Sequence, residues 1–288
     1  MTLPPFELHR PRAVEEVEDL LDRYGDDAAL YCGGTELLLV MKLGFASFSN
    51  LVDVKGIPEL HVLDAHDGEL RVGAAVTHRE LESSPLVERL VRPLAEMERR
   101  VANVRVRSVG TLGGNLCFSD PHSDPATFLL ATGAGLVVRR GTVERTIPMT
   151  EFVRGPYETA LERAELLTEI RIPALPPRAA VVHQRFATHE RPALTIACFA
   201  RADGGRVAEA RLAVGSVTPT PTRVLDAERA LVDIPLDATA AVAGAGEIAA
   251  AAIEPFADLN GSVEYKRNLV RVFVDRCCNA ALEQLRTG

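Results

Sequence analysis

Hydrophobic and polar positions follow two periods along the chain, one typical of helices and one typical of strands. In 11–24 and 262–284 apolar residues recur every three or four positions, which predicts amphipathic helices. Short apolar runs bounded by glycine, proline or aspartate predict strands. The predicted strands are 28–31, 51–54, 61–65, 69–75, 136–140, 143–147, 165–172, 181–187, 194–202 and 206–217.

Capping and turn residues add the remaining elements. Thr77 and Glu80 have the spacing of a capping box, and Ser84-Pro85 begins a helix that runs to about residue 100. Asp67-Gly68 and Asp203-Gly204-Gly205 predict tight hairpins. Further predicted helices are a short buried one at 35–42, an apolar one at 126–134 that starts with Asp124 as its N-cap, and two at 222–231 and 238–252.

Length and composition narrow the class of protein. A chain of 288 residues is long enough for two or three domains, and Pro173–Pro177 has the composition of a linker between them. The net charge of −8 argues against a general binder of nucleic acid or anionic membranes. No apolar run reaches the roughly 18 residues that a membrane span needs, and the first residues do not resemble a signal peptide, so we expect a cytoplasmic protein without a membrane span.

The five cysteines also exclude a class of site. They have no regular spacing and include no C-x-x-C pair, which argues against an iron–sulfur cluster or a structural zinc within this chain.

Two segments with paired glycines are the main candidates for a binding site. The first is Cys32–Leu37 (CGGTEL) and the second is Gly110–Asn115 (GTLGGN). Glycines beside hydroxyl residues let several backbone amides converge on an anion. A single glycine pair more often marks a turn, and neither segment fits the G-x-G-x-x-G or Walker patterns. Two such loops that face each other would hold a diphosphate, and with it a dinucleotide cofactor.

Polar residues near the second segment leave alternatives open. Thr111 and Asn115 can donate to ligand oxygens. Asp124 either caps a helix or accepts hydrogen bonds from ligand hydroxyls, and the two roles are compatible. Asp120, His122 and Asp124 alternate like metal ligands, but prolines stiffen the segment and no second ligand cluster accompanies it, so we expect no metal site.

These residues give the chain a resemblance to a known family. The segments 31–44, 106–134, 160–173 and 210–223 resemble the FAD-binding medium subunit of molybdenum hydroxylases, the group of carbon monoxide dehydrogenase and xanthine dehydrogenase. The resemblance implies an α+β fold with a two-subdomain FAD-binding domain of the vanillyl-alcohol-oxidase (PCMH) type, formed by 1–54 and 55–174. A C-terminal domain like that of the CO dehydrogenase flavoprotein, with a three-stranded antiparallel sheet and a helical bundle, would follow at 175–288.

The resemblance also implies residue roles. Leu167 would contact the flavin ring, and Arg185 stands where the family often has a lysine near the flavin, which keeps the charge but changes its geometry. No catalytic acid or base is expected. The predicted cofactor-binding residues are Cys32, Gly33, Gly34, Thr35, Glu36, Leu37, Thr111, Gly113, Gly114, Asn115, Asp120, Asp124, Leu167 and Arg185.

As a family member, the chain would carry electrons within a larger complex. A small subunit with [2Fe–2S] clusters would deliver them from a large subunit with a molybdenum cofactor, in a dimer of heterotrimers, and FAD would release them to an external acceptor. Two alternatives remain at this point: a stand-alone flavin oxidoreductase of the vanillyl-alcohol-oxidase type, and an assembly subunit that has lost FAD.

Overall fold

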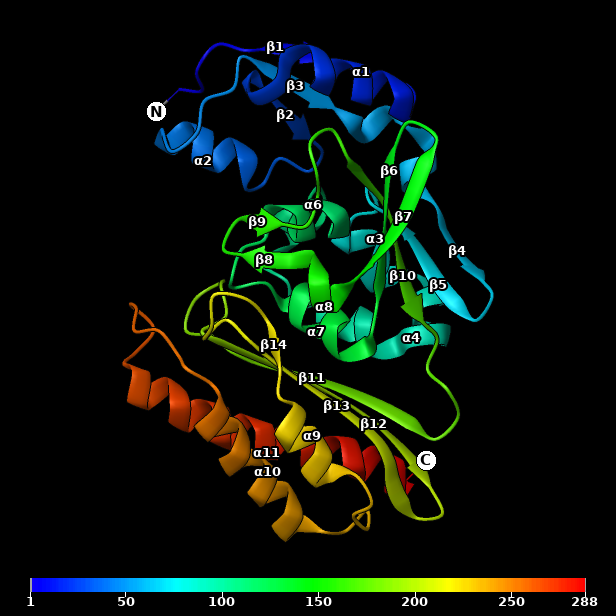
Figure 1. The fold of residues 1–288 in the computed structure, drawn as a ribbon, viewed down its shortest axis with the longest axis vertical. Helices are drawn as coiled ribbons and strands as arrows, with labels where there is room; N and C mark the ends of the chain where they lie inside the picture. The colour runs from blue at the N-terminus through cyan, green and yellow to red at the C-terminus, as the bar shows by residue number, and fades with distance from the viewer. Residues whose placement is uncertain (1, 288) are drawn as a thin grey trace.

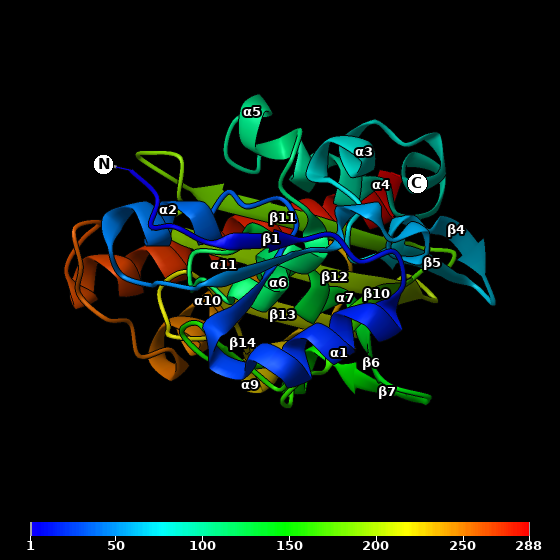
Figure 2. The same ribbon diagram turned by 90° about the horizontal axis from the view of Figure 1, so that it is seen from above.

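The N-terminal unit is a three-stranded parallel sheet with two helices (Figure 1, and from above in Figure 2). The structure is a computed structural model that describes residues 2–287. The strand order is β1-β3-β2, so β3 lies in the middle and both neighbours pair with it. The elements are β1 (Glu7–His9), α1 (Val14–Tyr24), β2 (Ala28–Tyr31), α2 (Leu37–Leu43) and β3 (Asn50–Asp53), with 3-10 turns at Gly25–Asp27, Val54–Gly56 and Pro58–His61.

The predictions for this unit are confirmed in outline. The strand at 28–31 has the predicted bounds, the strand at 51–54 begins one residue earlier, and β1 was not predicted. The prediction that α2 is buried is wrong, because only Met41 of this helix is buried, while Leu39 and Leu43 are 44% and 47% exposed.

The middle unit is a five-stranded sheet, in the order β4-β5-β10-β6-β7, covered by helices. Its pairs are antiparallel, and both predicted hairpins, β4–β5 and β6–β7, are confirmed. The strands are β4 (Leu63–His66), β5 (Glu69–Gly73), β6 (Gly135–Arg140), β7 (Val143–Pro148) and β10 (Leu166–Pro173), with a small separate pair β8 (Val153–Gly155) and β9 (Glu158–Thr159). The helices are α3 (His78–Ser83), α4 (Pro85–Glu98), α5 (Val104–Arg107), α6 (Leu112–Phe118), α7 (Asp124–Thr132) and α8 (Met149–Phe152).

The C-terminal unit is an antiparallel sheet with helices on one face, which lie farthest from the N-terminal unit in Figure 1. The sheet has four strands, β11 (Ala179–Phe186), β12 (Leu194–Asp203), β13 (Arg206–Gly215) and β14 (Thr222–Arg223), and not the three that the resemblance implied. The fourth is short and comes from residues predicted as helix, because Pro219 and Pro221 favour an extended chain before α9. The helices are α9 (Leu225–Leu231), α10 (Thr239–Ala252) and α11 (Val263–Thr287).

The alternation of side chains along β12 connects two cores. Ala197 and Phe199 face the core of the middle unit, while Ile196 and Cys198 face the core under α11. Helix α7 packs on the first of these faces and α11 on the second. The C-terminal sheet is therefore covered on both sides and shares a hydrophobic core with the middle unit. None of the helices within residues 2–287 has the length and apolar character to cross a membrane.

Candidate functional site

A cavity of about 450 Å³ contains nearly all of the predicted site residues in its wall. The first glycine segment, the start of α6, the residues that lead into α7, and Leu167 of β10 contribute to it, and Glu190–Pro192 from the loop between β11 and β12 complete it. Of the predicted residues, Arg185 alone does not line it. The other predicted residues line the same cavity, although they lie up to 135 positions apart in the sequence (Cys32 to Leu167).

The first glycine segment is a loop between β2 and α2, as predicted. Gly34 has a left-handed backbone (φ 70°), and a Cβ there would lie 2.3 Å from the ring of Tyr31, so only glycine fits. Within residues 2–287 the amides of Gly34, Thr35 and Glu36 donate to no acceptor. Free amides before a helix attract an anion, because their partial positive charges point the same way.

The second glycine segment differs from the prediction. It is the first turn of α6 and not a loop, with Thr111 as its N-cap. Its amides already have acceptors: Gly113 donates to the Ala74 carbonyl (3.2 Å), and Gly114 donates to Thr111 Oγ1 (3.1 Å). Tertiary contact explains the helix, since a Cβ on Gly113 would lie 2.6 Å from Ala74. At Gly114 the nearest obstacle to a Cβ is Thr111 Oγ1 at 2.8 Å, and the position otherwise opens on the cavity.

The two segments lie against each other, as we expected from their sequences. A Cβ on Gly33 would lie 2.4 Å from the carbonyl oxygen of Val109 and 2.7 Å from Cα of Gly110. Gly33 therefore serves the contact between the segments, and a substitution there would separate them.

Asp124 lies at the cavity wall, in the first turn of α7. The prediction that it caps this helix is wrong, because the N-cap is Ser123, whose hydroxyl accepts from the amide of Ala126 and donates to Asn115 Oδ1 at 2.6 Å. Asp124 is 4% exposed, and its Oδ1 is buried without a hydrogen-bond partner in the described part of the chain, residues 2–287. Burial raises the pKa of this carboxyl to about 7.

Two basic side chains lie behind Asp124. Nη1 of Arg185 is 3.4 Å from Asp124 Oδ2, and Arg185 also donates to the carbonyls of Arg100 and Glu190. His183 Nε2 is 3.6 Å from Asp124 Oδ1, and burial lowers the pKa of this histidine to about 3, so its ring is neutral. Arg185 thus does not line the cavity itself, but it contacts Asp124, which does.

Sequence reasoning missed Arg191, which closes one side of the cavity. Its guanidinium pairs with Glu36 Oε2 at 2.8 Å and with the carboxylate of Asp120, so it connects the first segment to the end of α6. The charged run His189–Arg191 between two strands was a signal, but nothing in the sequence indicates which acids it contacts. His122, the third residue of the possible metal set, bonds through its ring to the carbonyl of Pro192.

Comparisons with known proteins agree over the whole chain. A family model described as the FAD binding domain in molybdopterin dehydrogenase matches residues 4–175, and the CO dehydrogenase flavoprotein C-terminal domain matches 182–281. The chain is 34% identical to the carbon monoxide dehydrogenase medium chain of Hydrogenophaga pseudoflava, over 98% of each chain. It is 30% identical to the nicotine 6-hydroxylase medium subunit of Paenarthrobacter nicotinovorans, over 96% of this chain and 97% of that subunit. The solved carbon monoxide dehydrogenase of H. pseudoflava superposes with a TM-score of 0.95 at 35% identity, covering 98% of both chains.

Proposed function

We propose that this chain is the electron-transfer subunit of a molybdenum hydroxylase complex. The reason is that the chain belongs to the family of FAD-binding medium subunits of molybdenum hydroxylases. Its relatives are subunits of dehydrogenases and hydroxylases, so the chain is an oxidoreductase subunit that binds FAD. The resemblance seen in the sequence segments is thereby confirmed.

The junction of the two glycine segments at one cavity carries this proposal. The free amides of Gly34, Thr35 and Glu36 suit a diphosphate, and Gly114 leaves room for a ligand to approach the backbone. Asp124 lines the cavity, and a carboxyl can donate or accept a hydrogen bond with a sugar or ribityl hydroxyl. The donor and acceptor groups of the cavity therefore fit the parts of FAD.

The residues of this chain would bind and orient the cofactor and would take no part in bond breaking. We assign the diphosphate to Gly33–Glu36 with Thr111, Gly114 and Asn115, the hydroxyls to Asp124, and the apolar ring to Leu167. Arg185 acts on the site through Asp124. Bound FAD would supply the redox chemistry, since a flavin can take up single electrons from iron–sulfur clusters and give up two electrons to an external acceptor.

The finer organisation belongs to the same proposal. We place the two FAD-binding subdomains of the vanillyl-alcohol-oxidase type at 1–54 and 55–174, and the C-terminal domain at 175–288. The partners would be a [2Fe–2S] small subunit and a molybdenum large subunit, in a cytoplasmic dimer of heterotrimers. The names of the relatives, which describe medium chains or subunits, support a place in a complex of several chains.

A visible spectrum of the purified full chain, before and after reconstitution with FAD, tests the proposal. We expect one FAD per chain and no turnover of small reducing substrates by the chain alone. Turnover by the chain alone would instead indicate a stand-alone flavin enzyme. No flavin after reconstitution would indicate an assembly subunit and would overturn the proposal. Purification from the native host with metal analysis and mass spectrometry then identifies the partners.

A further inference from the structure

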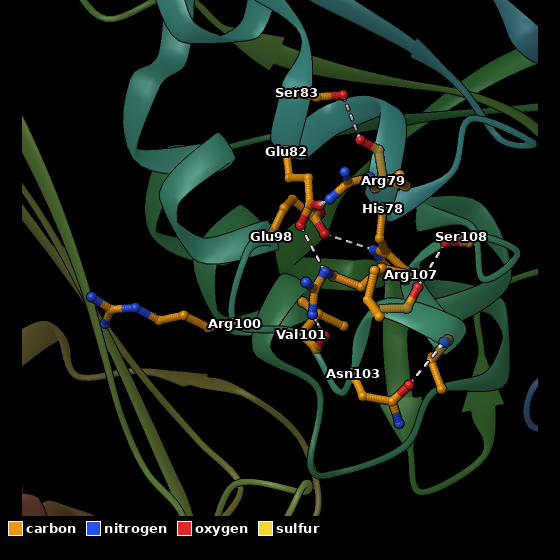
Figure 3. A network of polar contacts seen from close by, with 12 residues as sticks. His78, Arg79, Glu82, Ser83, Glu98, Arg100, Val101, Asn103, Arg107 and Ser108 are labelled. Atoms are coloured by element: carbon orange, nitrogen blue, oxygen red, sulfur yellow. Dashed lines mark hydrogen bonds and ion pairs between the residues drawn. The ribbon is translucent and has the colours of Figure 1, made fainter.

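A buried pair of charged groups lies beside the cavity and has no assigned role in it. Nδ1 of His78, the first residue of α3, is 2.6 Å from Oε2 of Glu98, the last residue of α4. Figure 3 shows the ring of His78 turned toward this carboxylate. The two residues are 2% and 0% exposed. Because a carboxylate only accepts, this contact makes Nδ1 of His78 a donor and fixes the plane of the ring.

The second nitrogen of His78 opens on the cavity. Within residues 2–287 no group forms a hydrogen bond with Nε2, yet Nε2 is not among the partnerless buried atoms that are sealed from solvent. His78 lines the cavity. Nε2 is therefore a polar atom of a nearly fully buried, cavity-lining residue, and within residues 2–287 it has no protein partner.

The position of His78 indicates which part of a ligand it would meet. Cδ2, which is bonded to Nε2, lies 3.3 Å from a Cβ placed on Gly110, and the same Cβ would lie 3.6 Å from Thr35 Oγ1. The edge of the ring therefore lies at the junction of the two glycine segments. The neighbouring free groups are donors, namely the Thr35 hydroxyl and the amides of residues 34–36, so this part of the wall suits an oxygen-rich, anionic group.

His78 and Glu98 form a buried ion pair. A buried carboxylate is stable only when a cation or several donors compensate it, and His78 provides the ion pair of Glu98 within residues 2–287. The contact of 2.6 Å is typical of a charge-assisted hydrogen bond. The other charged groups around the pair are Asp124 and Arg100, which act on the same region, and Glu82, which pairs with Arg79 and Arg107.

From this geometry we propose that His78 is a cofactor-binding residue that donates a hydrogen bond from Nε2 to an anionic oxygen of the FAD diphosphate, with Glu98 as the residue that pairs with its ring and positions it. The proposal rests on the proposed function, because it assumes that FAD occupies the cavity. It adds to the backbone donors a cationic side chain that the sequence motifs do not include.

Binding of FAD and of ADP to the flavin-free full chain tests the role of His78. A charge-assisted hydrogen bond is stronger than a neutral one, so His78→Gln should weaken FAD binding roughly tenfold or more. ADP carries the diphosphate without the flavin and should lose affinity by a similar factor. His66→Gln, at an exposed histidine in β4, is the matched control and should change neither affinity.

Glu98→Gln separates binding from a purely structural role. The glutamine oxygen can still accept from Nδ1, so the ring keeps its place but loses its charged partner. We expect Glu98→Gln to weaken the binding of FAD and of ADP several-fold and by similar factors, while the urea denaturation midpoint of the flavin-free chain stays close to that of the unmodified chain. This variant also keeps the test valid if His78→Gln does not fold, as judged by its circular dichroism spectrum.

The outcomes separate the two proposals. If the unmodified chain binds no FAD, the proposed function fails. If it binds FAD while folded His78→Gln binds FAD and ADP within twofold of it, His78 has no binding role. A folded Glu98→Gln variant that binds FAD and ADP within twofold of the unmodified chain would likewise overturn the inference. A loss for FAD without a loss for ADP would exclude the diphosphate contact.

Discussion

The two glycine pairs of this chain line one cavity, but they differ in what they offer to a ligand. Gly33-Gly34 belongs to a loop that leaves the amides of residues 34–36 without acceptors among residues 2–287. Gly113-Gly114 belongs to a helix whose amides donate to Ala74 and Thr111. The first pair lies in a loop that offers free amide donors to a ligand. In the second pair, Gly113 packs closely against Ala74 and Gly114 leaves space for a ligand.

This difference shows that paired glycines can serve a binding site in more than one way. In the second segment the two neighbours have separate tasks, since Gly113 is closed in by the backbone of Ala74 while Gly114 opens on the cavity. Substitutions at adjacent positions should therefore affect different properties, one the stability of the fold and the other the binding of FAD. The comparison can be tested one residue at a time.

The largest effect is expected from Gly114→Val. The new side chain would occupy the space through which a diphosphate approaches the start of α6, so FAD affinity should fall roughly a hundredfold or more, about 2.7 kcal/mol. The flavin-free protein should lose about 1 kcal/mol of stability, because the new Cβ would displace the N-cap hydroxyl of Thr111, which lies 2.8 Å away. Titration with FAD followed by flavin fluorescence gives the affinity. Gly244→Val in α10, where a Cβ meets open space, is the matched control, and equal FAD content in both variants would contradict the assignment.

Gly113→Ala should act on the fold. Its methyl group would lie 2.6 Å from backbone atoms of Ala74, and such overpacking costs about 1–3 kcal/mol. Urea denaturation of the flavin-free chain measures this loss, and Gly114→Ala serves as the comparison, with a loss of no more than about 1 kcal/mol expected because it disturbs only the N-cap hydroxyl of Thr111. An unaltered denaturation midpoint in Gly113→Ala would mean that the contact with β5 and its following turn is not rigid.

Local signals explain what the sequence predicted well. The hairpin turns depend on residues that accept positive φ, and Asp67-Gly68 and Gly204-Gly205 have it in the structure. The capping box at Thr77 and Glu80 forms as expected, because both of its hydrogen bonds lie within four residues.

Long-range contacts explain what it did not predict. Glycines disfavour helices by about 1 kcal/mol each, so α6 cannot be inferred from its own residues; the contact with Ala74 stabilises it. Strand β1 has three residues and no pattern, and its partner β3 lies more than forty positions away. The ion pair of Arg191 with Glu36 joins residues 155 positions apart, and no local rule selects it.

Asp124→Asn tests a side chain near the second glycine segment. On this side of the cavity the amides of Gly113 and Gly114 already have acceptors, so side chains such as Asp124 are the groups left for a ligand. The pKa of Asp124 is raised from 3.8 to about 7 by burial, so the folded state binds this proton more tightly than the unfolded state. Its contribution to stability is complete below pH 3.8 and is lost as the pH rises through 7, with a slope of up to about 1.4 kcal/mol per pH unit. Denaturation of the flavin-free chain from pH 4 to 8 should show this fall, and Asp124→Asn should remove it. Parallel pH profiles would show that the carboxyl is solvated.

The smallest effect is expected from Thr111→Val. This substitution tests whether the hydrogen bond from the amide of Gly114 to Thr111 Oγ1 stabilises mainly the helix or mainly the bound ligand. The substitution removes the N-cap of α6 and should lower the unfolding free energy by about 1 kcal/mol, while Thr111→Ser, which keeps the hydroxyl, should not. If the second segment contributes mainly clearance, FAD affinity should fall only about two- to fivefold, the effect of one ordinary hydrogen bond. Denaturation and FAD titration of the same samples give both numbers. A fall in affinity as large as that of Gly114→Val would show instead that the second segment binds the diphosphate as strongly as the first, and the distinction between the two glycine pairs would not hold.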